Sequence, residues 1–212
     1  MIAIRSEREI SLLRDANRIV TEVHALLAGM LQPGVTTREL DAVAEAHIRK
    51  CGATPAFKGY RGFPASTCIS IEDEVVHGIP GDRVIEAGQI VSIDVGTRYK
   101  GYFGDAAVSW GCGKIDEARQ RLLNTTDKAL AAGIAAARKD NWLRDIGRAV
   151  EAPCKAAGYG VVEDFVGHGI GTEMHEDPQL PNFDSHHRGP RLKAGMVLAI
   201  EPMVNMGTKK VK

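Results

Sequence analysis

Residues 92–110, SIDVGTRYKGYFGDAAVSW, contain the two acidic side chains that are the clearest candidates for metal binding or catalysis. Asp94 ends the apolar run IVSI, although a buried carboxylate is unfavourable and aspartate is depleted in strands. The alternating pattern predicts a β-hairpin with Lys100-Gly101 as its two-residue turn, which places Asp94 opposite Ala107. Asp105 then lies on the same face as Asp94, as a diagonal neighbour about 7–8 Å away.

Two interpretations of this acid pair stay open at the level of the hairpin. Like charges at such a separation repel each other in an apolar setting, and a cation between them removes the repulsion. The alternative is a pair of ordinary solvated hairpin acids. Separately, a turn displaced by one residue would put the two acids on opposite faces. The first interpretation predicts a metal site.

The second part of the chain supplies an imidazole and a further acid. GHGIGTEMHEDP holds His168 in a glycine-lined turn, and glycines let the backbone approach a site closely. Glu201 ends the apolar run AGMVLAIE. Together with Asp94 and Asp105 these residues form an oxygen-rich set that suits Mn, Fe, Co or Zn as divalent ions, expected as a pair bridged by carboxylates. A structural zinc site would be richer in sulfur and imidazole.

The remaining histidines and the cysteines suggest no further site. Four histidines fall on expected helix or loop surfaces and are assigned no role: His24, His47, His186 and His187. The cysteines lie far apart with no C-x-x-C pair, which argues against a zinc ribbon or a disulfide framework: Cys51, Cys68, Cys112 and Cys154. A reduced, cytoplasmic setting is expected.

The bulk composition is that of an ordinary globular protein. The chain has 212 residues, of which 44% are apolar and 25% charged. A net charge of zero predicts no broad basic surface, and therefore neither nucleic-acid binding nor attachment to a membrane. No run approaches the roughly 18 apolar residues of a membrane span, and the charged N-terminus lacks the apolar region of a signal peptide.

Apolar periodicity and turn residues predict an alternation of helices and short strands. Helices are expected over 6–31, 37–51, 116–138 and 142–157. Strands are expected as a strand, turn and strand over 66–77, a hairpin over 89–110, and pieces at 160–167 and 196–204.

The two parts of the chain resemble each other. AGQIVSID (87–94) aligns with AGMVLAIE (194–201) at an offset of 107, and 36–52 aligns with 142–158 at an offset of 106. Three such matches in one order, with VHGIP echoing GHGIG, indicate a duplication. We expect one catalytic domain, 1–212, with two α+β halves near 1–112 and 113–212 about a pseudo-twofold axis, in which Asp94 and Glu201 are equivalent.

Six segments carry a family resemblance: PGVTTRELD, GYRGFPASTCIS, DEVVHGIPGD, SIDVGTRYKGYFGDAA, GHGIGTEMHEDP and AIEPMV. In this order the chain resembles type I methionine aminopeptidase over nearly its whole length, and HGIP with IEPM separates it from prolidase and creatinase. The resemblance implies the α+β pita-bread fold, with two pseudo-symmetric halves, antiparallel sheets around a central metal site, and helices outside. The implied activity is metal-dependent removal of the initiator methionine from nascent proteins.

The resemblance also implies roles for individual residues. The ligands of two divalent ions would be Asp94, Asp105, His168 and Glu201. Contacts to substrate or transition state would come from His77 and His175, with Glu201 moving the proton. The methionine pocket would be lined by Tyr60, Phe63, Cys68 and Met174, whose soft, apolar character fits such a side chain.

The implied partners are the N-terminus of a peptide or nascent protein and, transiently, the ribosome, with the chain itself a monomer. The family has a fifth ligand, a glutamate on a strand after IEPM, and no acid follows Glu201 before Lys212. We therefore expect a C-terminally short form, lacking the last strand or strands of the second half, that is weakly active or inactive. Two alternatives are a non-catalytic binding protein of the same fold and a peptidase of the same superfamily acting on X-Pro bonds.

Overall fold

The computed structural model describes residues 2–212, which divide into two units. The first, here called the hairpin unit, comprises Arg8–Arg119 and Gly171–Met174. The second, the histidine unit, comprises Met1–Glu7, Gln120–Ile170 and His175–Lys212. The expected single domain with two repeated halves stays a prediction.

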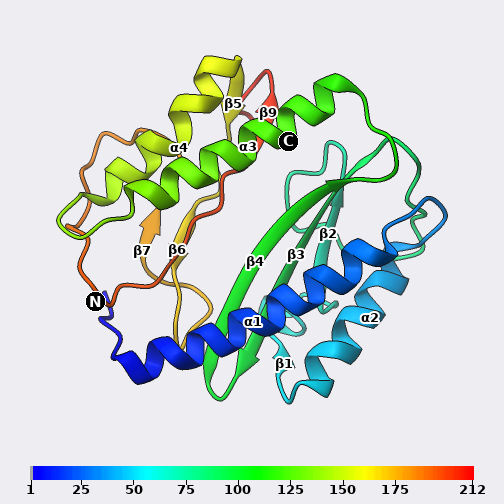
Figure 1. The fold of residues 1–212 in the computed structure, drawn as a ribbon, viewed down its shortest axis with the longest axis horizontal. Helices are drawn as coiled ribbons and strands as arrows, with labels where there is room; N and C mark the ends of the chain where they lie inside the picture. Colours follow the sequence, from blue (N-terminus) through cyan, green and yellow to red (C-terminus); the bar gives the residue numbers. More distant parts are fainter. Residues whose placement is uncertain (1) are drawn as a thin grey trace. The chain divides into compact units, whose positions relative to one another are not determined.

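The hairpin unit is built on a four-stranded antiparallel sheet (Figure 1). The central strand β3 pairs with β4 along one side and with β2 and β1 along the other. Its elements are α1 (Glu7–Met30), α2 (Thr37–Lys50), β1 (Thr54–Pro55), the short 3-10 helix η1 (Tyr60–Gly62), β2 (Thr67–Ile71), β3 (Ile90–Tyr99) and β4 (Tyr102–Gly111).

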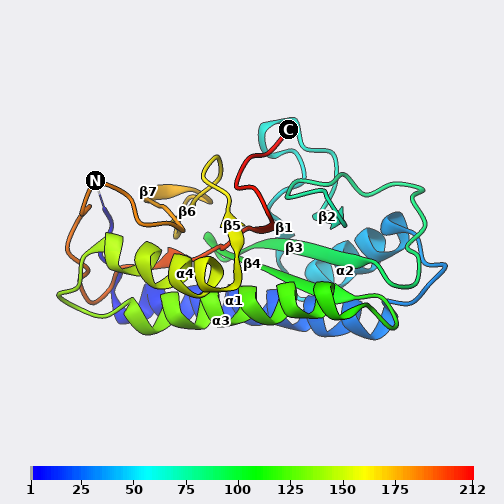
Figure 2. The ribbon, with the colours of Figure 1, turned by 90° about the horizontal axis from the view of Figure 1, so that it is seen from above.

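Helices α1 and α2 cover one face of this sheet (Figures 1 and 2). Alternate residues of β3, namely Val91, Ile93 and Val95, are fully buried in the core that the helices share with the sheet. The intervening residues, among them Asp94 and Gly96, therefore point to the opposite face. The sequence of β3 thus places its carboxylate on the side away from the helices.

The segment after β2 differs from the prediction. Residues 75–77 were expected to form a strand, yet the structure has a loop there. Glu72 and His77 adopt left-handed backbone angles, with φ of 59° and 62°, which strands exclude. The loop is joined to β2 by one backbone bond, in which the Ile69 N–H donates to the Gly78 carbonyl at 2.9 Å. The prediction of a second strand was wrong because apolar residues such as Val75 do not distinguish a strand from a packed loop.

The histidine unit contains two helices and two small sheets (Figure 1). The sheets have the orders β7-β6-β8 and β5-β9. Its elements are α3 (Glu117–Ala136), which begins in the hairpin unit, α4 (Leu143–Ala157), β5 (Tyr159–Val161), β6 (Gly167–Gly169), β7 (Glu176–Leu180), β8 (Leu198–Ala199) and β9 (Val204–Met206). The expected strand at 196–204 is broken between β8 and β9, where Pro202 has no N–H to donate.

The core of the histidine unit lies between α3, α4 and the strands. Ile146, Val150 and Cys154 of α4 are fully buried there. Gly133 allows α3 to approach α4 closely, because a Cβ at this position would lie 2.6 Å from Cγ2 of Val150. The absence of a side chain on α3 therefore sets the separation of the two helices.

Corresponding hydrogen bonds occur in the two units. The Thr37 N–H donates to the Arg83 carbonyl at 3.1 Å, and the Leu143 N–H donates to the Pro190 carbonyl at 3.0 Å. The donors are 106 positions apart (143 minus 37) and the acceptors 107 (190 minus 83), the offsets at which the sequence repeats. The first residues of α2 and of α4 are thus each bonded to the segment that precedes the apolar strand of the same half.

Within residues 2–212, no helix has the length and apolar character needed to cross a membrane.

Candidate functional site

The β3–β4 hairpin has the register that its sequence predicts. Tyr99 pairs with Tyr102 across the turn, and Asp94 pairs with Ala107. The turn residue Lys100 has a φ of 48°, as a two-residue hairpin turn of the primed type requires. Since Asp105 lies two residues before Ala107, the two carboxylates are diagonal neighbours on one face. The interpretation with opposite faces is thereby excluded.

Cys68 lies beside both carboxylates. In the β2–β3 ladder it pairs directly with Asp94. Burial, and after it the negative charges of Asp94 and Asp105, raises the pKa of the Cys68 thiol. The thiol is therefore a neutral, soft group at the edge of a strongly negative patch.

An apolar cluster adjoins this patch in the hairpin unit. Its buried members are Phe57, Cys68 and Met174, with Met174 only 2% exposed. Partly buried side chains packed against them are Ala56, Tyr60, Phe63 and Phe103. The structure thus brings together all four residues predicted to line an apolar pocket.

Two features of the backbone shape this cluster. Gly96 leaves room for it, because a Cβ there would lie 2.5 Å from Cε1 of Phe57 and 2.9 Å from Cε of Met174. The loop that carries Met174 is held by the Phe103 N–H, which donates to the Gly171 carbonyl at 2.9 Å. Glycine is therefore required in the middle of β3 because any side chain there would clash with the apolar cluster.

His77 is exposed on the loop that follows β2. Its left-handed φ of 62° is uncommon for a residue with a side chain, and such strain tends to concentrate at functional positions. The next residue, Gly78, fits against β2 only because it lacks a Cβ, which would lie 2.1 Å from the Ile69 carbonyl oxygen. The backbone on both sides of this histidine is therefore closely constrained.

In the histidine unit, His168 occupies the central strand β6. It is 6% exposed and lies between Gln179 of β7 and Ala199 of β8. Its Nδ1 is 2.8 Å from the Gly169 carbonyl oxygen. Because a carbonyl only accepts, Nδ1 carries the proton, and in the neutral ring the lone pair is on Nε2. Nε2 faces Oε1 of Glu201 at 3.2 Å.

His175 and Glu201 lie next to His168 in the same unit. The rings of His168 and His175 have their centroids 4.2 Å apart and are tilted by 46°. The backbone of Glu201 is fixed by Asn182, whose Nδ2 donates to the Glu201 carbonyl at 2.8 Å. Three of the predicted site residues are therefore neighbours within this unit.

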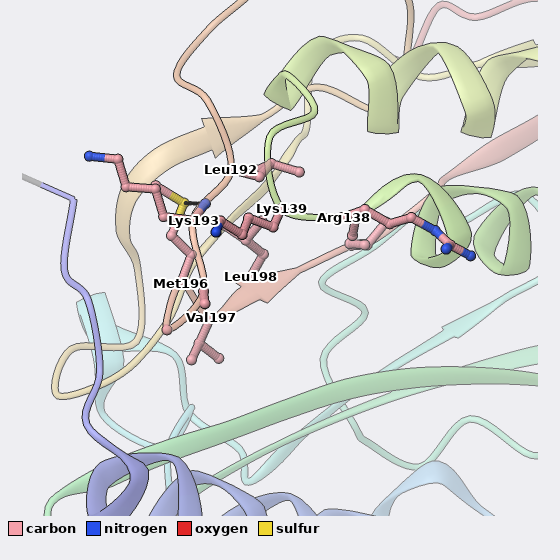
Figure 3. A pocket seen from close by; sticks show the side chains of 11 residues that line it. Arg138, Lys139, Leu192, Lys193, Met196, Val197 and Leu198 are labelled. Atoms are coloured by element: carbon pink, nitrogen blue, oxygen red, sulfur yellow. Dashed lines mark hydrogen bonds between the residues drawn. The ribbon is translucent and has the colours of Figure 1, made fainter.

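The histidine unit also contains a hollow of about 460 Å³ (Figure 3). It lies next to the segment that leads into β8, where the Lys193 N–H donates to Sδ of Met196 at 3.4 Å. The lining includes the cationic side chains of Arg138, Lys139 and Lys193 and apolar side chains such as Met196 and Leu198. None of the predicted site residues lines it, and we assign it no role.

The family model for metallopeptidase family M24 matches residues 11–211. The chain belongs to this family.

Within this family, the chain resembles curated relatives and solved structures that are methionine aminopeptidases. The chain is 50% identical to a methionine aminopeptidase of Clostridium perfringens, covering all of this chain and 85% of the relative. It is 45% identical to methionine aminopeptidase 1 of Bacillus subtilis, with 86% of that protein covered. A crystal structure of methionine aminopeptidase from Thermotoga maritima matches with a TM-score of 0.97 at 38% identity, over all of this chain and 86% of the other. The predicted pita-bread fold and the resemblance to methionine aminopeptidases are confirmed.

A member of the M24 metallopeptidases is expected to hold divalent metal, and the donors in the histidine unit fit one. Oε1 of Glu201 is buried without a hydrogen-bond partner among the described residues, and it faces a nitrogen lone pair of His168. Two acceptors in this position repel each other unless a cation or a proton lies with them. The Nδ1–H bond to a carbonyl is also the usual way in which a metal-binding histidine is oriented.

Two aromatic members of the apolar cluster were not predicted from the sequence. Phe57 and Phe103 belong to it, and neither was selected from the sequence. Phe103 occupies an alternate position to Asp105 on β4, so the predicted register could have placed it on the same face. Phe57 lies in a loop before η1, where no periodicity indicates its direction.

Proposed function

We propose that this chain is a metal-dependent methionine aminopeptidase that removes the initiator methionine from newly made proteins. One observation carries the proposal: Cys68 is both the ladder partner of Asp94 and a member of the apolar cluster with Met174. A carboxylate patch suited to metal and a pocket suited to a thioether side chain thus share one residue. The relatives named methionine aminopeptidase support the same function.

The ligands that we propose are Asp94, Asp105, His168 and Glu201. Three carboxylates and one imidazole suit two ions of Mn, Fe, Co or Zn. When bound, the ions would supply a water of lowered pKa and positive charge for the substrate carbonyl. The Asp94 and Asp105 pair supports this assignment, because two acids on one face of a hairpin repel each other and a bound cation offsets this repulsion.

Three residues would act on the substrate directly. Glu201 would take up a proton and pass it to the leaving amine, as general base and then general acid. His175 and His77 would donate hydrogen bonds to the substrate, at the carbonyl and along the backbone. The strained φ of His77 supports a role that requires a fixed ring position.

Specificity for the first residue would come from the apolar cluster. Met174, Cys68 and Phe57 are soft or apolar and nearly enclosed, which disfavours a charged side chain. A prolidase of Pyrococcus furiosus has a similar fold, with a TM-score of 0.82 at 27% identity, but this chain covers only 57% of it. We therefore favour methionyl peptides over X-Pro dipeptides as substrates.

The proposed substrate is the N-terminus of a nascent chain, so we expect action in the cytoplasm. A monomeric state and a transient contact with the ribosome remain expectations that follow from this substrate.

The test is a steady-state assay of the chain loaded with Mn²⁺ or Co²⁺ on Met-Ala-Ser, Lys-Ala-Ser and Ala-Pro. In keeping with the weak activity expected of this chain, we expect slow cleavage of the methionyl peptide alone, loss of cleavage with a chelator, and loss in Glu201→Gln. Glu163→Gln is the matched control, because Glu163 is an exposed acid of the same unit that pairs with Lys209. Preferred cleavage of Ala-Pro, or turnover that survives both the chelator and Glu201→Gln, would contradict the proposal.

A further inference from the structure

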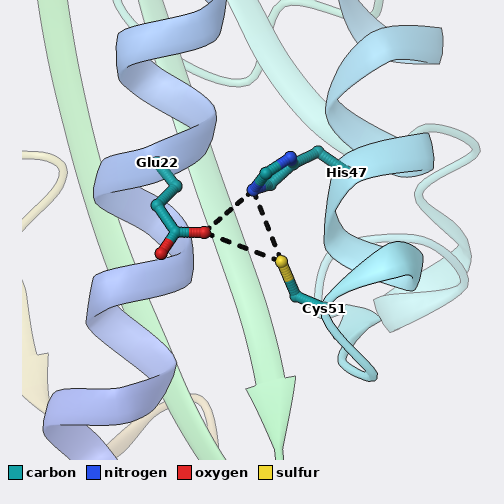
Figure 4. Close-up of side chains that lie close together, drawn as sticks. All are labelled: Glu22, His47 and Cys51. Atoms are coloured by element: carbon teal, nitrogen blue, oxygen red, sulfur yellow. Dashed lines mark hydrogen bonds and ion pairs between the residues drawn. The ribbon is translucent and has the colours of Figure 1, made fainter.

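A second group of metal-binding side chains lies between α1 and α2 of the hairpin unit (Figure 4). Glu22 comes from α1, and His47 and Cys51 come from the C-terminal end of α2. None of them belongs to the carboxylate patch or the apolar cluster described above. We propose that these three residues form a separate binding site for a zinc-like divalent ion that links the two helices.

The distances between the donor atoms match a metal site. Nε2 of His47 lies 3.0 Å from Oε2 of Glu22 and 3.4 Å from Sγ of Cys51, and Sγ lies 3.6 Å from Oε2. Tetrahedral zinc, with bonds of about 2.3 Å to sulfur and about 2.0–2.1 Å to nitrogen and oxygen, separates its ligand atoms by about 3.3–3.5 Å. The observed triangle therefore needs shifts of only a few tenths of an ångström to accept an ion.

The backbone holds this triangle in place. His47 and Cys51 are four residues apart, so they lie on one face of the last turn of α2. The Cys51 N–H donates to the His47 carbonyl at 3.0 Å, which fixes the spacing of the two side chains. The C-terminal end of a helix carries partial negative charge, and this favours a cation there.

The chemistry of the donors also fits a zinc-like ion. One sulfur, one imidazole and one carboxylate form the mixed set that borderline-soft ions prefer, whereas Mg²⁺ prefers oxygen alone. Binding would release the thiol proton to solvent and leave a thiolate ligand.

The site is open to an ion from solution. The side chains of His47 and Glu22 are 22% and 37% exposed, and Cys51 is half-buried. Three protein donors leave a fourth position for water. Arg18 is a competing cation, and it contacts the other oxygen of Glu22, Oε1, at 3.3 Å. Oε2 is thus directed to His47 and Cys51 while Arg18 is in place.

Alkylation of Cys51 tests the proposal without reference to activity. The chain is treated with N-ethylmaleimide in the presence of Zn²⁺ or Mg²⁺, and the labelling rate of each cysteine is measured by peptide mass spectrometry. We expect Zn²⁺ to slow the labelling of Cys51 at least tenfold and Mg²⁺ to leave it unchanged. Protection should disappear in Glu22→Gln and His47→Gln.

The matched control for Glu22→Gln is Asp15→Asn, because Asp15 is an acid of α1 that also pairs with Arg18, at 3.6 Å. In Asp15→Asn, Zn²⁺ should protect Cys51 from labelling as fully as in the unaltered chain. Labelling of Cys51 that is insensitive to Zn²⁺, or protection that persists in both ligand variants, would overturn the proposal.

A second measurement identifies the thiolate by its spectrum. Co²⁺ bound to a thiolate has a charge-transfer absorption in the near ultraviolet that oxygen and nitrogen ligands alone do not produce. We expect this absorption in the unaltered chain and in Cys68→Ser, and its loss in Cys51→Ser. If Cys51→Ser keeps the absorption, the ion is bound elsewhere and the proposal is wrong.

Discussion

Cys68 of β2 lies directly opposite Asp94 of β3 in an antiparallel ladder, so a neutral thiol adjoins a carboxylate on the face of the sheet that points away from α1 and α2. The same thiol packs with Phe57 and Met174. A polar region and an apolar region of the hairpin unit therefore meet at one residue. Substitutions on either side of it should separate metal binding from substrate selectivity.

Replacing Gly96 by alanine should damage substrate binding more than the fold. The new Cβ would lie within 3 Å of Phe57 and Met174 and would push their side chains into the pocket. We expect KM for a methionyl peptide to rise at least tenfold, because the displaced side chains would fill space that the substrate side chain needs, and the overpacking to cost about 1–3 kcal/mol of stability. Steady-state kinetics check this, with Gly101→Asn in the hairpin turn as the control. An unchanged KM would show that the substrate side chain binds elsewhere.

Peptides that differ only in their first residue should bind with affinities that reflect how well that residue fits the apolar cluster. Norleucine has the length of methionine but lacks the sulfur, and differences of this kind in an apolar pocket amount to about 1–3 kcal/mol. We expect a norleucyl peptide to compete moderately with the methionyl peptide, and a lysyl peptide not to compete. Inhibition constants measured with each peptide provide the check. If the lysyl peptide bound as tightly as the methionyl peptide, the pocket would have been assigned to the wrong residues.

Removal of the Asp105 carboxylate should expel one metal ion. Asp105 is half-buried on β4, and its backbone is held by Asn17, so alanine should leave the hairpin folded. If Asp105 lies between the two proposed ions, its loss would leave their mutual repulsion unopposed. Metal content per chain, measured by mass spectrometry, should fall from two to one in Asp105→Ala and stay unchanged in Asp73→Asn, an exposed turn acid. A variant that retains two ions would refute the bridging role.

The buried thiol of Cys154 should make the stability fall in alkaline solution. Burial in α4, and after it the charge of Glu151, raises the pKa of this thiol to about 11. The unfolded chain loses the same proton near its ordinary pKa of about 8.5, so it binds fewer protons than the folded state above that pH. The free energy of unfolding should therefore decrease between about pH 8.5 and pH 11, by an amount on the order of 3 kcal/mol.

Urea unfolding at a series of pH values measures this effect, with Cys154→Ser as the comparison. Serine keeps a hydroxyl near the Val150 carbonyl, which Sγ of Cys154 contacts at 3.5 Å, but does not ionise in this range. In the variant we expect the free energy of unfolding to decrease less steeply as the pH rises. Identical slopes would show that Cys154 does not contribute.

Local patterns in the sequence determined the long elements and the register of the hairpin. Both helices of the hairpin unit and the pairing of Asp94 with Ala107 follow from apolar periodicity and a two-residue turn. The reason is physical: period and turn length are properties of neighbouring residues, so few alternatives remain. For the same reason the sequence alone indicated that Asp94 and Asp105 share a face.

The tertiary structure decided which distant side chains meet. His47 appears in the sequence as a surface histidine without a role, yet Glu22 of α1 lies 3.0 Å from it. Phe57 joins the cluster of Cys68 and Met174 from a loop that has no periodicity. Such contacts depend on how helices pack and how loops close, which are set by many weak interactions spread over the chain rather than by a local pattern. Chemistry that needs two elements side by side is therefore visible only once those elements are in place.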